Sequence, residues 1–285
     1  MFPPSYPRHG GMTGNDSGMR RMPWTIRCRL LANGRPRLLA LAAAALCCGL
    51  AGWPLAASAQ EASPRVSLFR FDTTSAQLRL FLRDADGRPY ARFDRLAADL
   101  AARGQRLVFA MNAGMFEPDL SPTGLFVADA KQWSPLDERH AEGNFYLQPN
   151  GVFALTKAGP RLLTTSEFSR ARPDGVLLAT QSGPMLLMGG KLTPPVAAPP
   201  RSPAARPPSR FTRNAVCVDA PFVIFAIADT PMTLREFATW LRDEAGCRDA
   251  LYLDGAVSKV HDARSGRSDT GAAIGPIIAV VDGAR

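Results

Sequence analysis

The alternation of hydrophobic and polar positions predicts many short strands with helices interleaved among them. Residues 66–71 and 77–82 alternate with a period of two, as half-buried strands do. Continuous apolar runs predict buried strands at 107–111, 175–180, 214–218, 222–228, 250–253 and 277–281. Shorter runs predict strands at 124–127, 144–147 and 152–155, and a hairpin over 185–192 around Gly189-Gly190.

Two segments instead show the spacing of amphipathic helices. Residues 93–103 place apolar side chains three and four positions apart and are followed by Gly104. Residues 233–246 form the second such segment, in which Thr233 and Glu236 have the spacing of a capping box. Helices among many strands predict an α/β or α+β fold, as a single domain with a mixed β-sheet.

One stretch is too rich in proline for either element. Residues 194–208 hold seven prolines among fifteen positions, which predicts a surface loop or an extended segment. No internal repeat is visible, and the loop is too short to separate two domains. The predicted domain therefore runs from 64 to 283 and is interrupted only by this loop.

The N-terminal 59 residues have the pattern of a secretory signal peptide. Four arginines between 27 and 37 precede an apolar run at 38–50, and Ala57-Ser58-Ala59 supplies a small-x-small cleavage site. A membrane anchor is the alternative, but the run is short and rich in alanine. A lipoprotein anchored through Cys47 or Cys48 is another. The pattern predicts export and a periplasmic or secreted protein without a membrane span after cleavage.

Removing that segment changes the meaning of the charge. The formal net charge of the chain is +9, and the first 59 residues contribute +6 of it through seven arginines and one aspartate. The remainder carries only +3. The basic pI is therefore no argument for a nucleic-acid partner.

Two of the five cysteines, Cys217 and Cys247, remain in the mature part of the chain. In an oxidising compartment they could form a disulfide. Two buried free thiols are the alternative, because a free cysteine behaves as a small hydrophobic residue.

Three apolar strands end in a polar side chain and a glycine. The three ends are Asn112-Ala113-Gly114, Gln181-Ser182-Gly183 and Asp254-Gly255. Ligands bind at strand ends in α/β sheets, and glycine lets the backbone turn or approach a ligand closely. Ordinary turn formation is the alternative for each of them.

Other charged residues stand near predicted strands. Glu142 precedes the strand predicted at 144–147, and Arg213-Asn214 opens the strand at 214–218. Glu142 and Asp254 are candidate acid–base carboxylates, and Arg213 suits a phosphate or carboxylate. The alternatives are a solvated acid and a structural ion pair.

No motif indicates a metal or an organic cofactor. His140 and His261 lack a partner at metal-ligand spacing, and no nucleotide-binding or serine-hydrolase signature is present. The loop 137–140 is predicted to be exposed. We expect no cofactor, although Asp254 and neighbouring oxygens leave a divalent cation open.

Six segments occur in an order that resembles the phosphodiester glycosidase domain family. They are AMNAGMF (110–116), SPTGLFV (121–127), EGNFYLQPNGVF (142–153), ATQSGPML (179–186), RNAVCV (213–218) and GCRDALYLDGAVSKV (246–260). The family includes the enzyme that uncovers mannose 6-phosphate, and the closer similarity is to its exported bacterial branch. The resemblance covers roughly residues 64–283.

The resemblance implies a hydrolase that cleaves the bond between a sugar's anomeric carbon and a phosphodiester oxygen, with a carbohydrate or phosphoglycan as substrate. It also implies an active-site lining made of Asn112, Gly114, Ser182, Gly183, Arg213, Asn214, Asp254 and Gly255. Glu142 matches a block of the bacterial branch. In this interpretation Asp254, Glu142 and Arg213 are catalytic and the other residues bind substrate.

Two other functions are compatible with the same residues. One is an envelope protein that binds a sugar or phosphoglycan without turnover. The other is a glycoside hydrolase or cell-wall amidase that acts on uncharged linkages.

Overall fold

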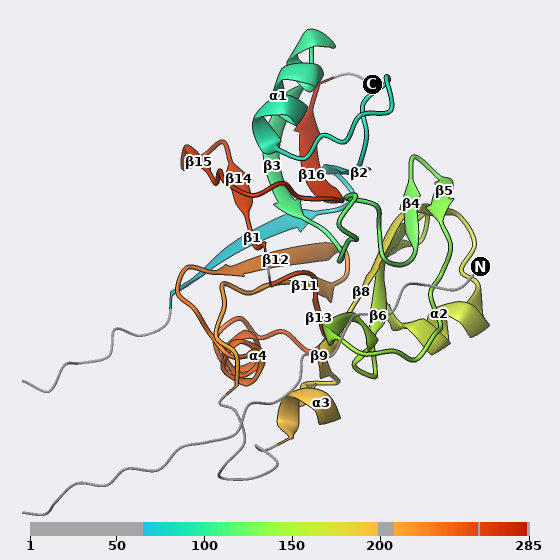
Figure 1. Ribbon diagram of the computed structural model, residues 1–285, viewed down its shortest axis with the longest axis vertical. Helices are drawn as coiled ribbons and strands as arrows, with labels where there is room; N and C mark the ends of the chain where they lie inside the picture. Colours follow the sequence, from blue (N-terminus) through green and yellow to red (C-terminus); the bar gives the residue numbers. More distant parts are fainter. Residues whose placement is uncertain (1–64, 199–207, 256, 284–285) are drawn as a thin grey trace, which may run out of the picture. The chain divides into compact units, whose positions relative to one another are not determined.

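The computed structural model describes residues 65–198, 208–255 and 257–283 (Figure 1). Their contacts place them in one compact unit. The predicted signal peptide, 1–59, lies outside the described residues, as does most of the proline-rich segment. The first prolines of that segment form a short helix, α3 (Pro194–Ala197), rather than a loop. No helix among the described residues has the length and apolar character needed to cross a membrane.

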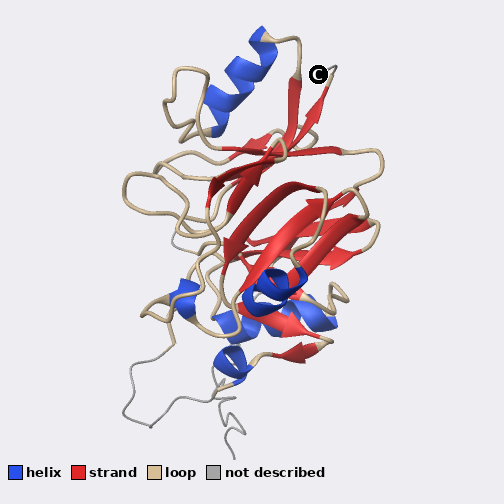
Figure 2. Ribbon diagram, turned by 90° about the vertical axis from the view of Figure 1, so that its right-hand side faces the viewer, coloured by secondary structure: helices blue, strands red, loops and turns tan. Residues whose placement is uncertain are grey.

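Three antiparallel sheets make up most of the regular secondary structure of the described residues (Figure 2). The first sheet has the strand order β1 (Val66–Asp72), β12 (Phe222–Ala228), β11 (Asn214–Asp219), β13 (Ala250–Tyr252), β9 (Met185–Met188) and β10 (Lys191–Leu192). The second has the order β15 (Arg267–Ser268), β14 (Val260–Asp262), β3 (Arg106–Asn112), β16 (Ile277–Asp282) and β2 (Gln77–Phe81). The third has the order β5 (Lys131–Ser134), β4 (Phe126–Ala128), β8 (Val176–Ser182), β6 (Gly151–Thr156) and β7 (Gly159–Thr164).

Helices are few among the described residues. They are α1 (Phe93–Ala102), α2 (Thr165–Ala171), α3, α4 (Leu234–Asp243) and the single 3-10 turn η1 (Asn144–Tyr146). Both predicted helices are present as α1 and α4, and the capping box of Thr233 and Glu236 is confirmed. The prediction of a mixed sheet was wrong, because every strand pair described here is antiparallel. Helices do lie between strands, but fewer than predicted, because most consecutive strands are joined without one.

One predicted strand is also absent. The strand predicted at 144–147 is replaced by η1, because only Phe145 of this segment is buried and Leu147 is exposed. A strand needs alternate side chains on one packed face, and a single buried aromatic does not provide one.

The core joins the three sheets through aromatic side chains. Phe109 of β3 stacks on Phe225 of β12 with ring centroids 5.3 Å apart, and Phe153 of β6 meets Phe225 edge-on at 6.2 Å. All three side chains are fully buried. Burial of such a side chain contributes about 1.5–3 kcal/mol, so this contact ties the sheets together at their centre.

A disulfide links β11 to the end of helix α4. Cys217 and Cys247 are bonded, with a Cα–Cα distance of 6.0 Å across a separation of 30 residues. Of the two alternatives, a disulfide and two free thiols, the structure shows the disulfide. Both cysteines also pack in the cluster under α4, so the bond braces the strand next to β13.

Loss of this disulfide is expected to lower the free energy of unfolding by about 3–4 kcal/mol, the loop-closure value for a ring of this size. The measurement is denaturant unfolding of Cys217→Ser/Cys247→Ser beside the unreduced protein. The reducing agent dithiothreitol should destabilise the parent protein and leave the double variant unchanged. Equal stability of both proteins would contradict the expectation.

Candidate functional site

The strand ends predicted to hold functional side chains meet where the three sheets adjoin. Because β11 and β13 are antiparallel, Asn214 at the start of β11 lies beside the residues that leave β13. The backbone N–H of Leu253 donates to the carbonyl of Asn214 at 3.2 Å. The side-chain Oδ1 of Asn214 accepts from the backbone N–H of Asp254 at 2.8 Å. Asn214 therefore holds Asp254 in place from the neighbouring strand.

Asn112, at the end of β3, brings the second sheet to the same point. Its Oδ1 accepts from Nδ2 of Asn214 at 3.0 Å and from the backbone N–H of Lys259 at 2.9 Å. Its own Nδ2 finds no hydrogen-bond partner among the described residues, although the side chain is only 1% exposed. A buried amide donor without an acceptor is costly, so Asn112 is a candidate for hydrogen bonding to a ligand.

Ser182 connects the third sheet. Its hydroxyl donates to the carbonyl of Leu253, the residue before Asp254. The preceding Gln181 binds the backbone of Leu125 and Asp137 and so fixes the exit of β8. Because its proton is committed to Leu253, Ser182 fixes the end of β13, which is a different task from the substrate contact expected of it.

Arg213 is the largest fully buried polar side chain, with 1% exposure. Its Nε donates to the carbonyl of Met232 at 2.9 Å, and Nη2 donates to the carbonyl of Ser209 at 2.7 Å. Nη1 donates to the hydroxyl of Tyr252 at 2.7 Å. These partners are neutral, and Arg213 forms no salt bridge with a described carboxylate. A buried guanidinium held this way carries positive charge that a bound anion could neutralise.

Tyr252 and Gly255 place that cation next to Asp254. Burial raises the pKa of Tyr252 to about 12, and the nearby Asp254 carboxylate adds to the rise while Arg213 opposes it. A Cβ on Gly255 would lie 1.5 Å from the Tyr252 hydroxyl and 2.9 Å from Nη1 of Arg213. The side of Gly255 on which a Cβ would stand is thus filled by Tyr252 and Arg213, so packing accounts for this glycine.

The other two glycines are also required by packing. A Cβ on Gly114 would lie 2.2 Å from the carbonyl oxygen of Gln181, and one on Gly183 would lie 2.5 Å from the carbonyl oxygen of Phe145. The hydroxyl of Thr180 accepts from the Gly114 N–H at 3.1 Å. These glycines let backbone segments of different sheets touch, which brings the strand ends together.

Glu142 is the predicted site residue that forms no hydrogen bond or ion pair with the other described site residues. Its side chain is exposed and has no hydrogen bond or ion pair with a described residue. The loop before it was predicted to be exposed, yet Asp137 is buried. Hydrogen bonds from Arg139 hold the pKa of Asp137 below its usual value. The buried acid of this segment is therefore Asp137, and it is already paired.

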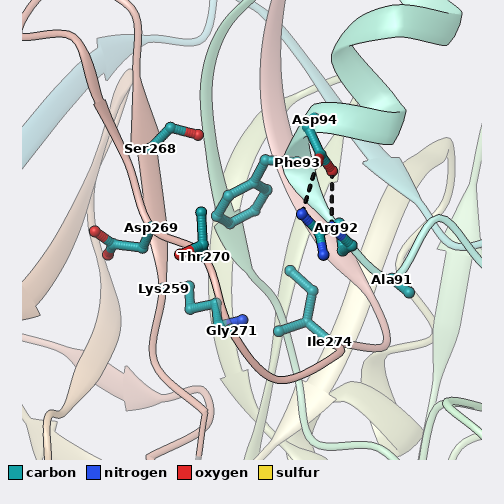
Figure 3. Close-up of a pocket in the computed structure, with 10 residues that line it drawn as sticks. All are labelled: Ala91, Arg92, Phe93, Asp94, Lys259, Ser268, Asp269, Thr270, Gly271 and Ile274. Carbon is teal, nitrogen blue, oxygen red and sulfur yellow. Dashed lines mark hydrogen bonds and ion pairs between the residues drawn. The ribbon is translucent and has the colours of Figure 1, made fainter.

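Lys259 lies next to Asn112 through its backbone, but its side chain leads elsewhere. The Nζ donates to the carbonyl of Ala272, in a cavity of about 30 Å³ under the start of helix α1 (Figure 3). Arg92 and Asp94 also line this cavity and bond each other at 2.8 Å. Burial and the positive charge of Arg92 lower the pKa of Lys259. Arg213 is thus the cation associated with Asp254.

Comparison with known proteins decides the family. The sequence profile of the phosphodiester glycosidase family matches residues 105–280, more than half of the chain. The chain belongs to the phosphodiester glycosidase family. Every predicted site residue falls inside the match.

Two further similarities extend the comparison. The chain is 24% identical over 199 residues to the uncharacterized protein YigE of Escherichia coli (strain K12), covering 69% of this chain and 74% of that protein. Its fold is similar to the catalytic domain of zebrafish N-acetylglucosamine-1-phosphodiester alpha-N-acetylglucosaminidase, solved in a form auto-inhibited by its pro-peptide. That likeness has a TM-score of 0.50 and 14% identity, and covers 78% of this chain and 84% of the other. At this identity it shows the fold alone.

In this member of the phosphodiester glycosidase family, Tyr252 contributes to the candidate site but was not selected from the sequence. The signal for Tyr252 was its position two residues before Asp254, which puts both side chains on one face of the strand. Among the described residues no group of three or more His, Cys, Asp or Glu side chains is placed to hold a metal ion.

Proposed function

We propose that the protein is an exported hydrolase that cleaves the glycosidic bond between a sugar and a phosphodiester. The observation that carries the proposal is the placement of Asp254 beside the buried cation Arg213, through Tyr252 and Gly255. Membership of the phosphodiester glycosidase family supports the same reaction class and a carbohydrate substrate.

Asp254 is the proposed catalytic carboxylate. Cleavage at the anomeric carbon builds positive charge on the sugar ring, and a carboxylate held nearby stabilises that charge or accepts a proton from the attacking water. Asp254 is the most exposed member of the cluster at 7%, whereas Arg213 and Asn112 are each at 1%. Substrate would therefore meet Asp254 first. The hydrogen bond from Asp254 N–H to Asn214 restricts the position of the carboxylate.

Arg213 is proposed to stabilise the leaving group. When the bond between the anomeric carbon and the phosphodiester oxygen breaks, the electron pair stays on the phosphate, which then carries two negative charges. A guanidinium in a site with little water interacts with that charge more strongly than it would at the surface. Only four hydrogen bonds to described residues are formed by its five N–H groups, so one donor on Nη1 can face the substrate.

Asn112, Asn214 and Ser182 have different tasks in this proposal. Asn112 offers its Nδ2 to a sugar or phosphate oxygen, because that amide lacks a partner among the described residues. Asn214 and Ser182 act as positioning residues, since their side chains bind the N–H and the carbonyl of the peptide group between Leu253 and Asp254. Glu142 is the proposed second carboxylate, on an exposed segment in which Phe145 lies against Gly183.

Export is part of the proposal. The predicted signal peptide supports it, and so does the disulfide between Cys217 and Cys247, because such bonds persist in oxidising compartments. The proposed location is the periplasm or the exterior of the cell.

The experiment is a panel of sugar 1-phosphodiesters, with N-acetylglucosamine-1-phosphodiester first because a structural relative carries that name. We expect free sugar and a phosphate monoester as products from at least one member, and slower release from matched aryl glycosides without phosphate. Binding of panel members without turnover would favour the glycan-binding alternative. Turnover of the uncharged glycosides alone would contradict the proposal.

A further inference from the structure

A second concave site lies away from Asp254, between the second and third sheets. It is a groove of about 760 Å³ between β2 and the hairpin formed by β4 and β5. Pockets that enclose small-molecule ligands measure roughly 300–1,000 Å³. None of the residues lining it belongs to the candidate active site. We call it the β2–β5 groove.

The groove runs along two sheet edges. Among the described strands, β2 pairs only with β16, and β5 pairs only with β4. Apolar side chains of β2 and β4 form its floor, including Leu80 and Phe126. An open edge next to an apolar floor is a surface that binds other molecules more readily than a fully polar one.

Trp133 dominates the rim of the groove. It is 59% exposed, which is unusual for so large an aromatic side chain. Nζ of Lys131 lies 4.1 Å from the centroid of its ring. The indole is thus held by a cation on one side and open to solvent over the rest of its surface. An exposed aromatic plate beside a cation suits a ligand with an apolar face and an anionic group.

The charges of the groove are unbalanced. Arg79 is paired with Asp129 at 3.2 Å, and Asp84 is paired with Arg95. By contrast, Arg83 and Lys131 line the groove without an ion pair to any described residue. The groove also contains a buried donor, Nε of Arg79, that has no partner among the described residues. Arg83 donates to the carbonyl of Gly87 and Lys131 lies over Trp133, so two cations without an ion pair to a described residue favour an anionic ligand.

We propose that the β2–β5 groove binds an acidic oligosaccharide, with a sugar ring against Trp133 and carboxylate, phosphate or sulfate groups at Arg83 and Lys131. The choice of a carbohydrate over another polyanion rests on the proposed function. The groove would hold the glycan chain that carries the scissile bond, or a neighbouring chain of the same kind, apart from the catalytic carboxylate.

The test is calorimetric titration of the purified protein with hexagalacturonate, using maltohexaose as the uncharged control of equal length. Hexagalacturonate is expected to bind, and to bind more weakly when NaCl is raised from about 0.05 to 0.3 M, because salt screens exposed charges. Trp133→Ala should weaken binding about tenfold, and Lys131→Ala several-fold. Arg70→Ala is the matched control, because Arg70 makes the same kind of contact with Phe222, 3.8 Å from its ring, outside the groove.

The outcomes separate the groove from the catalytic proposal. Unchanged affinity in Trp133→Ala, equal binding of maltohexaose, or no binding of hexagalacturonate would overturn the groove proposal even if phosphodiesters are hydrolysed. Complete displacement of hexagalacturonate by inorganic phosphate at the same total charge concentration would also overturn the groove proposal, because the groove would then be a simple anion site that does not recognise a sugar. Asp254→Asn should retain hexagalacturonate binding, and the absence of turnover in the parent protein would count against the catalytic proposal alone.

Discussion

Replacing Asp254 by Asn is expected to lower kcat on a sugar 1-phosphodiester by about 10²–10⁴-fold, the range for removal of a positioned acid–base group. Asparagine has the same shape and keeps the backbone N–H that donates to Asn214. The fold should therefore be retained, and Tm should change little. The measurement is steady-state release of free sugar, with Tm recorded on the same preparation. Turnover at the parent rate would remove Asp254 from the mechanism.

Glu142→Gln is the matched control for that variant. It makes the same carboxylate-to-amide change at the other predicted catalytic acid, which is exposed and unbonded in the structure. We expect its kcat to stay within about threefold of the parent, the scale of an ordinary surface substitution. A loss comparable to that of Asp254→Asn would instead show that the loop carrying Glu142 closes on the substrate and that the site uses two carboxylates.

The contrast between Asp254 and Glu142 shows what the sequence could predict about the site. Asp254 follows a continuous apolar run, and such a run predicts a buried strand whether the neighbouring strands are parallel or antiparallel to it. The position of Glu142 depended on the strand predicted at 144–147, and that segment is η1. The element beside Asp254 was strongly patterned and is a strand in the structure, whereas the weakly patterned segment beside Glu142 is not.

Whether the strands pair in parallel or antiparallel could not be predicted from the hydrophobic pattern. Period-two alternation does not distinguish parallel from antiparallel pairing, and the argument that ligands bind at strand ends was taken from parallel α/β sheets. The residues still converge here, for another reason. In antiparallel pairs the start of one strand lies beside the end of the next, so Asn214 meets Leu253 and Asp254 without any crossover helix.

The glycines illustrate a second limit. From the sequence, Gly114, Gly183 and Gly255 were interpreted as allowing a turn or a close approach to a ligand. In the structure a Cβ at any of them would strike protein atoms within 3 Å. A glycine beside a polar residue can mark the close approach of another part of the protein, and that part can come from a distant segment, such as Gln181 for Gly114. The predicted positions were informative, and the inferred partner was not.

Arg213→Met is expected to lower the preference for phosphodiesters over matched uncharged glycosides by about 100-fold, since it removes the charge that opposes the leaving phosphate. The variant will also be less stable, because Tyr252 and the carbonyls of Met232 and Ser209 lose a donor. A lower total activity of the variant would therefore not distinguish loss of folded enzyme from loss of the charge. The ratio of kcat/KM for the two substrates is independent of the fraction of folded enzyme, and it isolates the electrostatic effect.

Arg213→Lys distinguishes charge from geometry. Lysine keeps one positive charge but cannot donate to Met232, Tyr252 and Ser209 at once, because it is a point charge without the planar fork. If charge alone governs leaving-group departure, the ratio of kcat/KM should recover most of the way to that of the parent. If the planar guanidinium must also direct a donor at the phosphate, the ratio of kcat/KM for Arg213→Lys should be close to that for Arg213→Met. A ratio equal to the parent's in both variants would mean that the buried guanidinium serves only to join Met232, Tyr252 and Ser209, and that Asp254 acts on a substrate without a phosphate.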